Sequence, residues 1–456
     1  MNTIWLPDLS QATGPKYQQL IESIRAAIVS KQLQPGEKLP PVRELAWQLQ
    51  VTPGTVARAY RTLVDQAVLS AAVGRGTYVA EPVTPPALPE NPDMVDLSSP
   101  VLPDMGQDAL IRSCYARMAQ ESGHNLTGYP GQNTEQGAKQ AVYKWLSGAD
   151  LGPYQADDIT LTHGAQNAIM MVLQTTLQDP DPVILTEDLS YAGFRNAARL
   201  LRARIVGLKM DEGGIVPQSY EDACKAYGPQ VLCTSPGVNN PTTCSTGLQR
   251  RQDIAGIARK YGGIILEDDS YFLESGGLPS YRALLPQQSY YVSSLSKPLT
   301  PSLRVGFALG PVGQCQKLQR TARYNHFGLA LSVTDLAERV LNAPELPRIR
   351  VSLIARVNEY LRMAVNVLGS FDLKWREGVP FLWLKLPRNW RASNFCMAVE
   401  KQGVRLRSAD DFALLDGRAP HAVRITINGR VRLDDFEAAL FRIEKLLRNP
   451  PDSIGL

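Results

Sequence analysis

The sequence is poor in the residues that build metal centres and disulfide frameworks. It contains four histidines and six cysteines, and no two of the cysteines form a C-x-x-C pair. No histidine lies at metal-ligand spacing from a cysteine, so we expect free thiols and no bound metal. The cysteines are Cys114, Cys224, Cys233, Cys244, Cys315 and Cys396. This pattern is typical of a protein from a reducing compartment.

Long apolar runs are also missing. No stretch of about 18 uncharged apolar residues occurs, which argues against a membrane span. The N-terminal residues MNTIWLPDLSQ lack a basic segment followed by an apolar core, so we expect no signal peptide. These absences predict a cytoplasmic protein that does not bind membranes. The length of 456 residues, with 44% hydrophobic and 20% charged residues, predicts a globular chain of two or three domains.

The small positive charge of the chain is unevenly distributed. The formal net charge is +4, and residues 1–80 hold eight Lys or Arg against five Asp or Glu. This segment therefore carries +3, which leaves +1 for the remaining 376 residues. A basic excess in a small domain is compatible with a nucleic-acid partner, although charge alone does not assign one.

The basic N-terminal segment has the pattern of a small helical domain. Residues 16–31 place apolar side chains on one helical stripe. Pro41 opens a second helical stretch, and Thr52 is expected to cap a third one, PGTVARAYRTLVDQ. The stretch VLSAAVGRGTYVA then alternates and turns at residues 74–76, as a hairpin does. Three helices followed by a hairpin predict a winged helix-turn-helix domain over residues 11–80.

The order of these motifs is more specific than their periodicity. LPPVRELAWQLQVTPGTVARAYRTL followed by GRGTYV resembles the GntR family of bacterial transcription factors. The resemblance implies a double-stranded DNA operator as partner, with the third helix in the major groove. It places the following residues at DNA-facing positions: Arg43, Thr55, Arg58, Arg75 and Gly76. Pro53 and Ala71-Ala72 stand where basic residues are common, so we expect modest affinity per head and binding as a dimer to paired half-sites.

A proline-rich segment follows the predicted DNA-binding domain. EPVTPPALPENPDM contains five prolines and little that could pack into a core. Such a segment is semi-rigid and extended, at about 3.1 Å per residue. We therefore predict a linker over residues 81–95 that lets the head move relative to the body.

Beyond the linker, short β-rich runs alternate with helical stretches. The clearest strands are PVILTED, QVLCTSP, GGIILEDD, YYVSSLS and VGFALG, and helical stretches such as GAQNAIMMVLQTTLQD lie between them. This alternation predicts an α/β body with a mostly parallel sheet and helices on both faces. Ligands of such sheets bind at the carboxyl ends of the strands, so the residues after each run are the candidate site.

Polar residues follow three of these strands. Asn240 stands in an Asn-Pro pair after QVLCTSP, and Asp268 follows GGIILE, with Tyr271 three residues later. Lys297 follows YYVSSLS, and Arg304 comes seven residues after it. Each feature alone has an ordinary explanation, such as a turn, a helix cap or a solvated charge. Their order and spacing together indicate a shared site.

This set resembles the fold-type I aminotransferases, which use pyridoxal 5'-phosphate, over roughly residues 96–450. The resemblance implies a large cofactor-binding domain at 96–335 and a smaller C-terminal α+β domain at 336–456. Lys297 would form the Schiff base with the cofactor aldehyde, and Asp268 would keep the pyridine nitrogen protonated. Asn240 and Tyr271 would hydrogen-bond the phenolic oxygen of the ring, and Tyr191 would stack on its face.

The same resemblance assigns the groups that hold the cofactor phosphate and the substrate. The implied phosphate ligands are Gly164, Ala165, Gln166, Ser294, Ser296 and Arg304. A helix that begins near Gly164 would direct backbone N–H groups at the phosphate. Tyr129 would reach this group from a second subunit, and Arg424 would bind a carboxylate of the substrate or effector.

A GntR-type head on an aminotransferase-like body resembles the MocR subfamily of GntR regulators along nearly the whole chain. This resemblance implies a homodimer with a head-to-tail arrangement. It also implies a regulator that responds to pyridoxal 5'-phosphate, to an amino compound, or to both. Two alternatives stay open: an active aminotransferase with an autoregulatory head, and a decayed body that only dimerises. The retention of Lys297, Asp268 and Asn240 argues against the last one.

Overall fold

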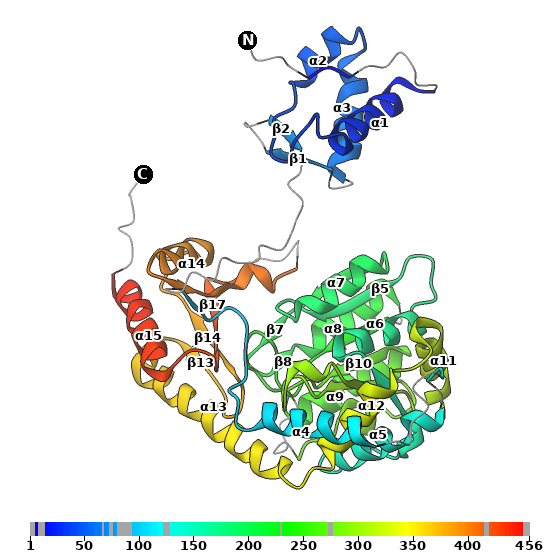
Figure 1. Cartoon of the computed structure of the whole chain (residues 1–456), viewed down its shortest axis with the longest axis vertical. Coiled ribbons are helices and arrows are strands. Elements are labelled where there is room, and N and C mark those ends of the chain that lie inside the picture. The colour runs from blue at the N-terminus through cyan, green and yellow to red at the C-terminus, as the bar shows by residue number, and fades with distance from the viewer. Residues whose placement is uncertain are drawn as a thin grey trace. The chain divides into compact units, whose positions relative to one another are not determined.

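The chain forms two compact units, Met1–Pro92 and Asp93–Leu456, which are considered separately. The structure, a computed structural model shown in Figure 1, describes residues 5–7, 14–65, 68–72, 76–79, 94–121, 128–130, 132–228, 230–271, 277–414 and 419–449. The predicted linker at 81–95 lies outside the described residues, except for Met94 and Val95. No helix among the described residues is long and apolar enough to cross a membrane.

The N-terminal unit has the predicted order of three helices and a hairpin. Its elements are α1 (Lys16–Val29), α2 (Val42–Gln48), α3 (Pro53–Asp65), β1 (Leu69–Ala72) and β2 (Gly76–Val79). Buried Leu20, Ile24 and Leu45 meet Leu63 in one core. Thr52 caps α3 as predicted, because its Oγ1 accepts a hydrogen bond from the backbone N–H of Thr55 at 3.3 Å.

The larger unit is built on a seven-stranded sheet of order β4-β12-β11-β10-β9-β5-β6. The strands are β4 (Ile159–Thr162), β5 (Val183–Glu187), β6 (Arg204–Leu208), β9 (Val231–Thr234), β10 (Ile264–Asp268), β11 (Ser289–Ser294) and β12 (Gly306–Leu309). β12 pairs antiparallel with both of its neighbours, and the other pairs are parallel. The prediction of a mostly parallel sheet is confirmed.

Helices cover both faces of this sheet. In β10 the side chain of Leu266 joins a core with α6 (Ala165–Thr176), α7 (Ala192–Leu200) and α11 (Cys315–His326). The preceding Ile265 joins a second core with α8 (Pro217–Tyr227), α9 (Leu248–Tyr261) and α10 (Tyr281–Leu284). Successive side chains of a strand point to opposite faces, so both faces of β10 are buried. A third core involves α4 (Gln107–Gln120), α5 (Gln132–Trp145) and α12 (Leu331–Leu341).

The C-terminal part carries a second, antiparallel sheet of order β13-β14-β17-β16. Its strands are β13 (Leu373–Lys374), β14 (Phe381–Lys385), β16 (Arg407–Ser408) and β17 (Ala422–Thr426). The long helix α13 (Leu346–Leu368), yellow in Figure 1, packs with α15 (Leu433–Arg448) beside it. α14 (Ala392–Lys401) completes this layer, and β15 (Val404–Arg405) pairs with β3 (Val95–Asp96). A short hairpin, β7 (Met210–Asp211) and β8 (Gly214–Ile215), borders the larger sheet.

Candidate active site

A cavity of about 320 Å³ lies at the carboxyl ends of the central strands. Strands β9, β10 and β11 end beside it, and β16 and β17 of the second sheet close its other side. Eleven of the residues predicted for the cofactor or the effector line it: Ala165, Gln166, Tyr191, Asn240, Asp268, Tyr271, Ser294, Ser296, Lys297, Arg304 and Arg424. Residues almost 260 positions apart in the chain (165 to 424) thus meet in one place.

Lys297 lies in the turn that follows β11. Burial, together with the charges of Arg424 and Arg304, lowers the pKa of Lys297 to about 8. The nearby Ser296 has a buried Oγ without a hydrogen-bond partner in the described part of the chain. The amine is therefore held in a site that disfavours its charged form, next to a hydroxyl that is ready to bond.

Asp268 is the last residue of β10 and faces the same cavity. Its Oδ1 accepts hydrogen bonds from the backbone N–H of Ser270 at 3.0 Å and from the Ser270 hydroxyl at 2.5 Å. Burial raises the pKa of Asp268 to about 6, although the Ser270 hydrogen bonds act in the opposite direction. No basic side chain forms an ion pair with Asp268 among the described residues.

Arg424 and Asn240 are joined by a hydrogen bond on the side of the second sheet. Nη1 of Arg424 donates to Oδ1 of Asn240 at 2.6 Å, and Nη2 donates to the carbonyl oxygen of Ser98 at 2.8 Å. The guanidinium lies 4.7 Å from the centroid of the Phe412 ring. Burial lowers the pKa of Arg424 to about 10, and only 4% of the residue is exposed. Tyr271 packs edge-on against Phe381, with the ring centroids 5.2 Å apart.

The opposite end of the cavity is formed by the start of α6 and by Arg304. Gly164 caps α6 with φ 80°, a conformation that favours glycine. A Cβ at this position would lie 2.8 Å from Nη2 of Arg304, so the missing side chain also lets the guanidinium approach. Nη2 of Arg304 donates to the carbonyl oxygen of His163 at 3.4 Å. The N–H groups at the start of α6 and this guanidinium form a corner of hydrogen-bond donors, a type of arrangement that suits an anion.

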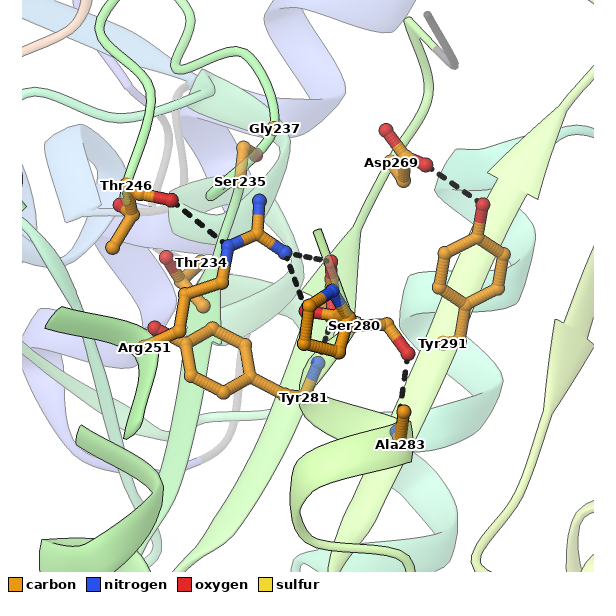
Figure 2. Close-up of polar contacts among 12 residues, drawn as sticks. Thr234, Ser235, Gly237, Thr246, Arg251, Asp269, Ser280, Tyr281, Ala283 and Tyr291 are labelled. Carbon is orange, nitrogen blue, oxygen red and sulfur yellow. Dashed lines mark hydrogen bonds and ion pairs between the residues drawn. The ribbon is translucent and has the colours of Figure 1, made fainter. Parts of the chain in front are cut away.

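The other face of β10 carries a second buried polar cluster, shown in Figure 2. Arg251 of α9 donates through Nε to the carbonyl oxygen of Thr246 at 2.9 Å and through Nη1 to that of Pro279 at 3.0 Å. Its Nη1 also lies 3.5 Å from Oε1 of Glu267, the residue before Asp268. Oε2 of Glu267 accepts the backbone N–H of Tyr281 at 2.6 Å. This cluster joins α9, β10 and α10 and does not line the cavity.

The single chain leaves Tyr129 outside the cavity. Tyr129 is 91% exposed, and its ring centroid lies 6.4 Å from that of Phe327. Eight lining residues were missed in the sequence, among them Ser270, Arg407 and Phe412. Ser270 stands within the stretch around Asp268, but no sequence pattern separates Arg407 from the exposed basic residues near it. The described residues hold no group of three or more potential metal ligands, and all six cysteines are free thiols.

The candidate DNA-facing residues lie on the N-terminal unit. Arg43 and Arg58 are exposed, and the Arg58 guanidinium lies 4.0 Å from the centroid of the Tyr17 ring. Thr55 is half-buried at the start of α3, and Gly76 is exposed with φ 113° at the start of β2. Arg75 lies outside the described residues.

Two family models match the chain. The model of bacterial regulatory proteins of the gntR family matches residues 16–79, and that of aminotransferase class I and II matches residues 92–442. The uncharacterized HTH-type transcriptional regulator YdeF of Bacillus subtilis is 28% identical over 97% of this chain and 96% of its own length. The vitamin B6 salvage pathway transcriptional repressor PtsJ of Salmonella typhimurium is 29% identical over 91% of this chain and 95% of its own length.

Solved structures agree with the fold of the larger unit. An archaeal alanine:glyoxylate aminotransferase superposes with a TM-score of 0.69 at 21% identity, over 78% of this chain and 91% of the other. At this identity the likeness concerns the fold. The prediction of a GntR-type head on an aminotransferase-like body is confirmed.

Proposed function

Because this chain belongs to the aminotransferase class I and II family and carries a gntR-type domain, we propose that it is a transcriptional regulator that binds DNA and pyridoxal 5'-phosphate. The N-terminal unit binds the operator, and the body responds to the cofactor, to an amino compound, or to both. The observation that carries the proposal is one cavity in which Lys297, Asp268 and Arg304 meet, on a chain with a helix-turn-helix unit. The Salmonella relative, which is named as a vitamin B6 salvage pathway transcriptional repressor, supports the proposal.

The residues of the cavity fit this cofactor. A phosphate suits the corner of Arg304 and the α6 N-terminus, where backbone N–H groups and a guanidinium converge. The hydroxyl of Ser296 is buried without a partner among the described residues, so a phosphate oxygen would satisfy it. Asp268 is a buried carboxylate without a basic partner in the described chain, which suits a protonated pyridine nitrogen.

When bound, pyridoxal 5'-phosphate supplies an aldehyde and an electron-withdrawing ring. Lys297, with a pKa of about 8, is partly neutral near physiological pH, and the neutral amine is the nucleophilic form. Asp268, with a pKa of about 6, is mostly ionised at pH 7 and can hold a proton on the ring nitrogen. Because Arg424 bonds Oδ1 of Asn240, the amide nitrogen of Asn240 is oriented as a donor for the phenolic oxygen.

A second copy of the chain is part of the proposal. The three most exposed Phe, Tyr or Trp side chains among the described residues of the body are Tyr129 at 91%, Tyr324 at 80% and Phe327 at 74%. Exposed aromatic groups of this size often mark a protein interface. In a homodimer Tyr129 would reach the phosphate corner of the partner, a role that its own cavity does not give it.

An active aminotransferase with a 2-oxo acid acceptor is the second candidate function. The lowered pKa of Lys297 beside the ring-binding set favours it. A regulator differs from an enzyme in coupling, because an effector shifts a two-state protein only by its differential affinity for the two states. The affinity change must then be reciprocal between DNA and effector, which turnover does not require.

The test uses the purified full-length chain with added pyridoxal 5'-phosphate. We expect a visible absorbance band, and borohydride should fix the cofactor as added mass on the peptide that contains Lys297. Lys297→Ala should lose this covalent link and keep the weaker, non-covalent binding. A chain that stays colourless with excess cofactor would refute the cofactor part of the proposal.

DNA binding is measured in parallel with and without cofactor and candidate amino compounds. If the chain is a regulator, the amino compound should change the affinity of the chain for operator DNA. Operator DNA should then change the affinity of the chain for the compound by the same factor. Sustained turnover of about 1 per second or faster with no change in DNA affinity would favour the enzyme instead.

A further inference from the structure

Arg407 places a second arginine on the effector side of the cavity. Arg407 of β16 and Arg424 of β17 are direct partners in an antiparallel pair, so their side chains leave the same face of the sheet. Both line the cavity. Arg407 is half-buried, and within the described chain it forms no hydrogen bond or ion pair with another residue.

The neighbouring acidic residues are otherwise engaged or exposed. Asp410 accepts the hydroxyl of Ser408 at 2.6 Å, and Asp411 is exposed on the following turn. By contrast Arg405, two residues before Arg407, bonds Glu400 through Nε at 3.1 Å and does not line the cavity. Among the described residues, Arg405 therefore has an anionic partner within the fold and Arg407 has none.

Arg424 also forms no ion pair with an acidic side chain in the described part of the chain. Its two terminal nitrogens bond the amide oxygen of Asn240 and the carbonyl oxygen of Ser98, which are neutral acceptors. Its Nε is buried and has no hydrogen-bond partner among the described residues. A buried guanidinium with an unused N–H is ready to bind a carboxylate.

The charges that line the cavity are strongly unequal. Four lining residues are basic, namely Lys297, Arg304, Arg407 and Arg424, and Asp268 is the acidic one among them. In the proposed function the phosphate uses Arg304, and Lys297 and Asp268 contact the cofactor ring and aldehyde. Arg407 and Arg424 then remain as two like charges directly opposite each other, an arrangement that is unfavourable without an anion.

One carboxylate would neutralise only one of these two charges. Each guanidinium has a free edge: Nε–H on Arg424 and the whole group on Arg407. We propose, on the basis of the proposed function, that the effector is an amino acid with a second carboxylate, which binds Arg424 with one carboxylate and Arg407 with the other. Arg407 is then the residue that determines specificity.

The test compares matched amino acids on the full-length chain loaded with pyridoxal 5'-phosphate. The probes are L-aspartate and L-glutamate against L-asparagine and L-glutamine, which have the same length but no second charge. Binding is followed by the change in the visible spectrum. A charge-assisted contact with Arg407 should make the acids bind about tenfold to a hundredfold more tightly than their amides.

Arg407→Gln should reduce this ratio to about twofold or less, while affinity for the amides and for the cofactor stays within about twofold. Arg405→Gln removes one positive charge from the preceding strand, β15, and should leave the ratio unchanged. Equal affinity for acids and amides in the parent chain, or an unchanged ratio in Arg407→Gln, would overturn the inference. Failure of the proposed function itself looks different, because the chain would then show no visible band with the cofactor alone.

Discussion

The two faces of β10 treat neighbouring carboxylates differently. Glu267 contacts Arg251 of α9 and the backbone N–H of Tyr281 of α10. Figure 2 labels Arg251 and Tyr281. Asp268 points into the cavity, where Ser270 is the residue that donates to it. Burial raises the pKa of both, to about 7 for Glu267 and about 6 for Asp268.

This difference separates a carboxylate that is paired within the fold from one that has no cationic partner among the described residues. The guanidinium beside Glu267 is itself held by two carbonyl oxygens, so the cluster is complete within the protein. Asp268 has a serine and no cation in the described chain, and it borders open space. A buried charge without a partner is costly to the fold. The position of Asp268 at a cavity therefore supports the proposal that the cofactor supplies its cationic partner.

The largest effect on stability is expected on the face of β10 where Glu267 is paired with Arg251. Arg251→Met keeps the length of the side chain but removes the cation beside Glu267, so the buried carboxyl must take up a proton or stay charged without a partner. The substitution also removes donors from the carbonyl oxygens of Thr246 and Pro279. We expect a loss of about 3–5 kcal/mol in the free energy of unfolding of the body. Urea unfolding of the full-length chain measures this change.

A matched control is available on the same helix. Arg259 of α9 is exposed and donates to the carbonyl oxygen of Leu284, so Arg259→Met should cost about 0.5 kcal/mol or less. The double variant Arg251→Met with Glu267→Gln should recover part of the loss, because it removes the unpaired charge. Equal stability of Arg251→Met and Arg259→Met would remove the contrast between the two faces.

The next largest effect is expected at Asp268 on the cavity side, where removing the carboxylate should stabilise the cofactor-free chain. The pKa of Asp268 in the folded chain is raised from 3.8 to about 6, so the folded state holds this proton more tightly than the unfolded state. Its contribution to stability is present below pH 4 and is lost as the pH rises to about 6. The full difference corresponds to about 3 kcal/mol at neutral pH.

Asp268→Asn removes this titration. Without cofactor, the variant should be as stable as the parent or more stable at pH 7, and the gap should close between pH 6 and pH 4. Affinity for pyridoxal 5'-phosphate should fall in the same variant. Thermal unfolding of the cofactor-free chains across this pH range measures the gap, and a variant that is less stable than the parent at pH 7 would contradict the argument.

The cavity face of β10 could be predicted from the sequence, and the face that carries Arg251 and Glu267 could not. The strand ends at Asn240, Asp268 and Lys297 stand out because strand and helix patterns alternate around them, and the carboxyl ends of parallel strands meet at one edge. The ion pair of Arg251 and Glu267 joins a helix and a strand whose packing depends on the whole sheet. A basic residue in the middle of a helix carries no local signal of burial.

Arg407 was missed for a related reason. VRLRS alternates basic and apolar residues, so Arg405 and Arg407 look equally exposed in the sequence. Only the register of β16 against β17, which pairs Arg407 with Arg424, brings it to the cavity. That register depends on the pairing of two separate strands, which a pattern within one segment does not contain.

The smallest effect is expected from the single hydrogen bond between the hydroxyl of Ser270 and Asp268. Ser270 donates its hydroxyl to Asp268, and a donor to the charged form lowers the pKa of a carboxyl. Ser270→Ala should therefore raise the pKa of Asp268 further, by about 0.5–1 pH unit for a net hydrogen bond of about 1 kcal/mol. Affinity for pyridoxal 5'-phosphate, which needs the ionised carboxylate, should then begin to fall at a correspondingly higher pH as the solution is acidified. Ser270→Thr retains the hydroxyl and should keep the parent profile. If the pH profile of cofactor affinity in Ser270→Ala coincides with that of the parent, the ionisation of Asp268 does not control cofactor binding. If the profile shifts in Ser270→Ala and returns in Ser270→Thr, cofactor binding depends on the hydroxyl at position 270.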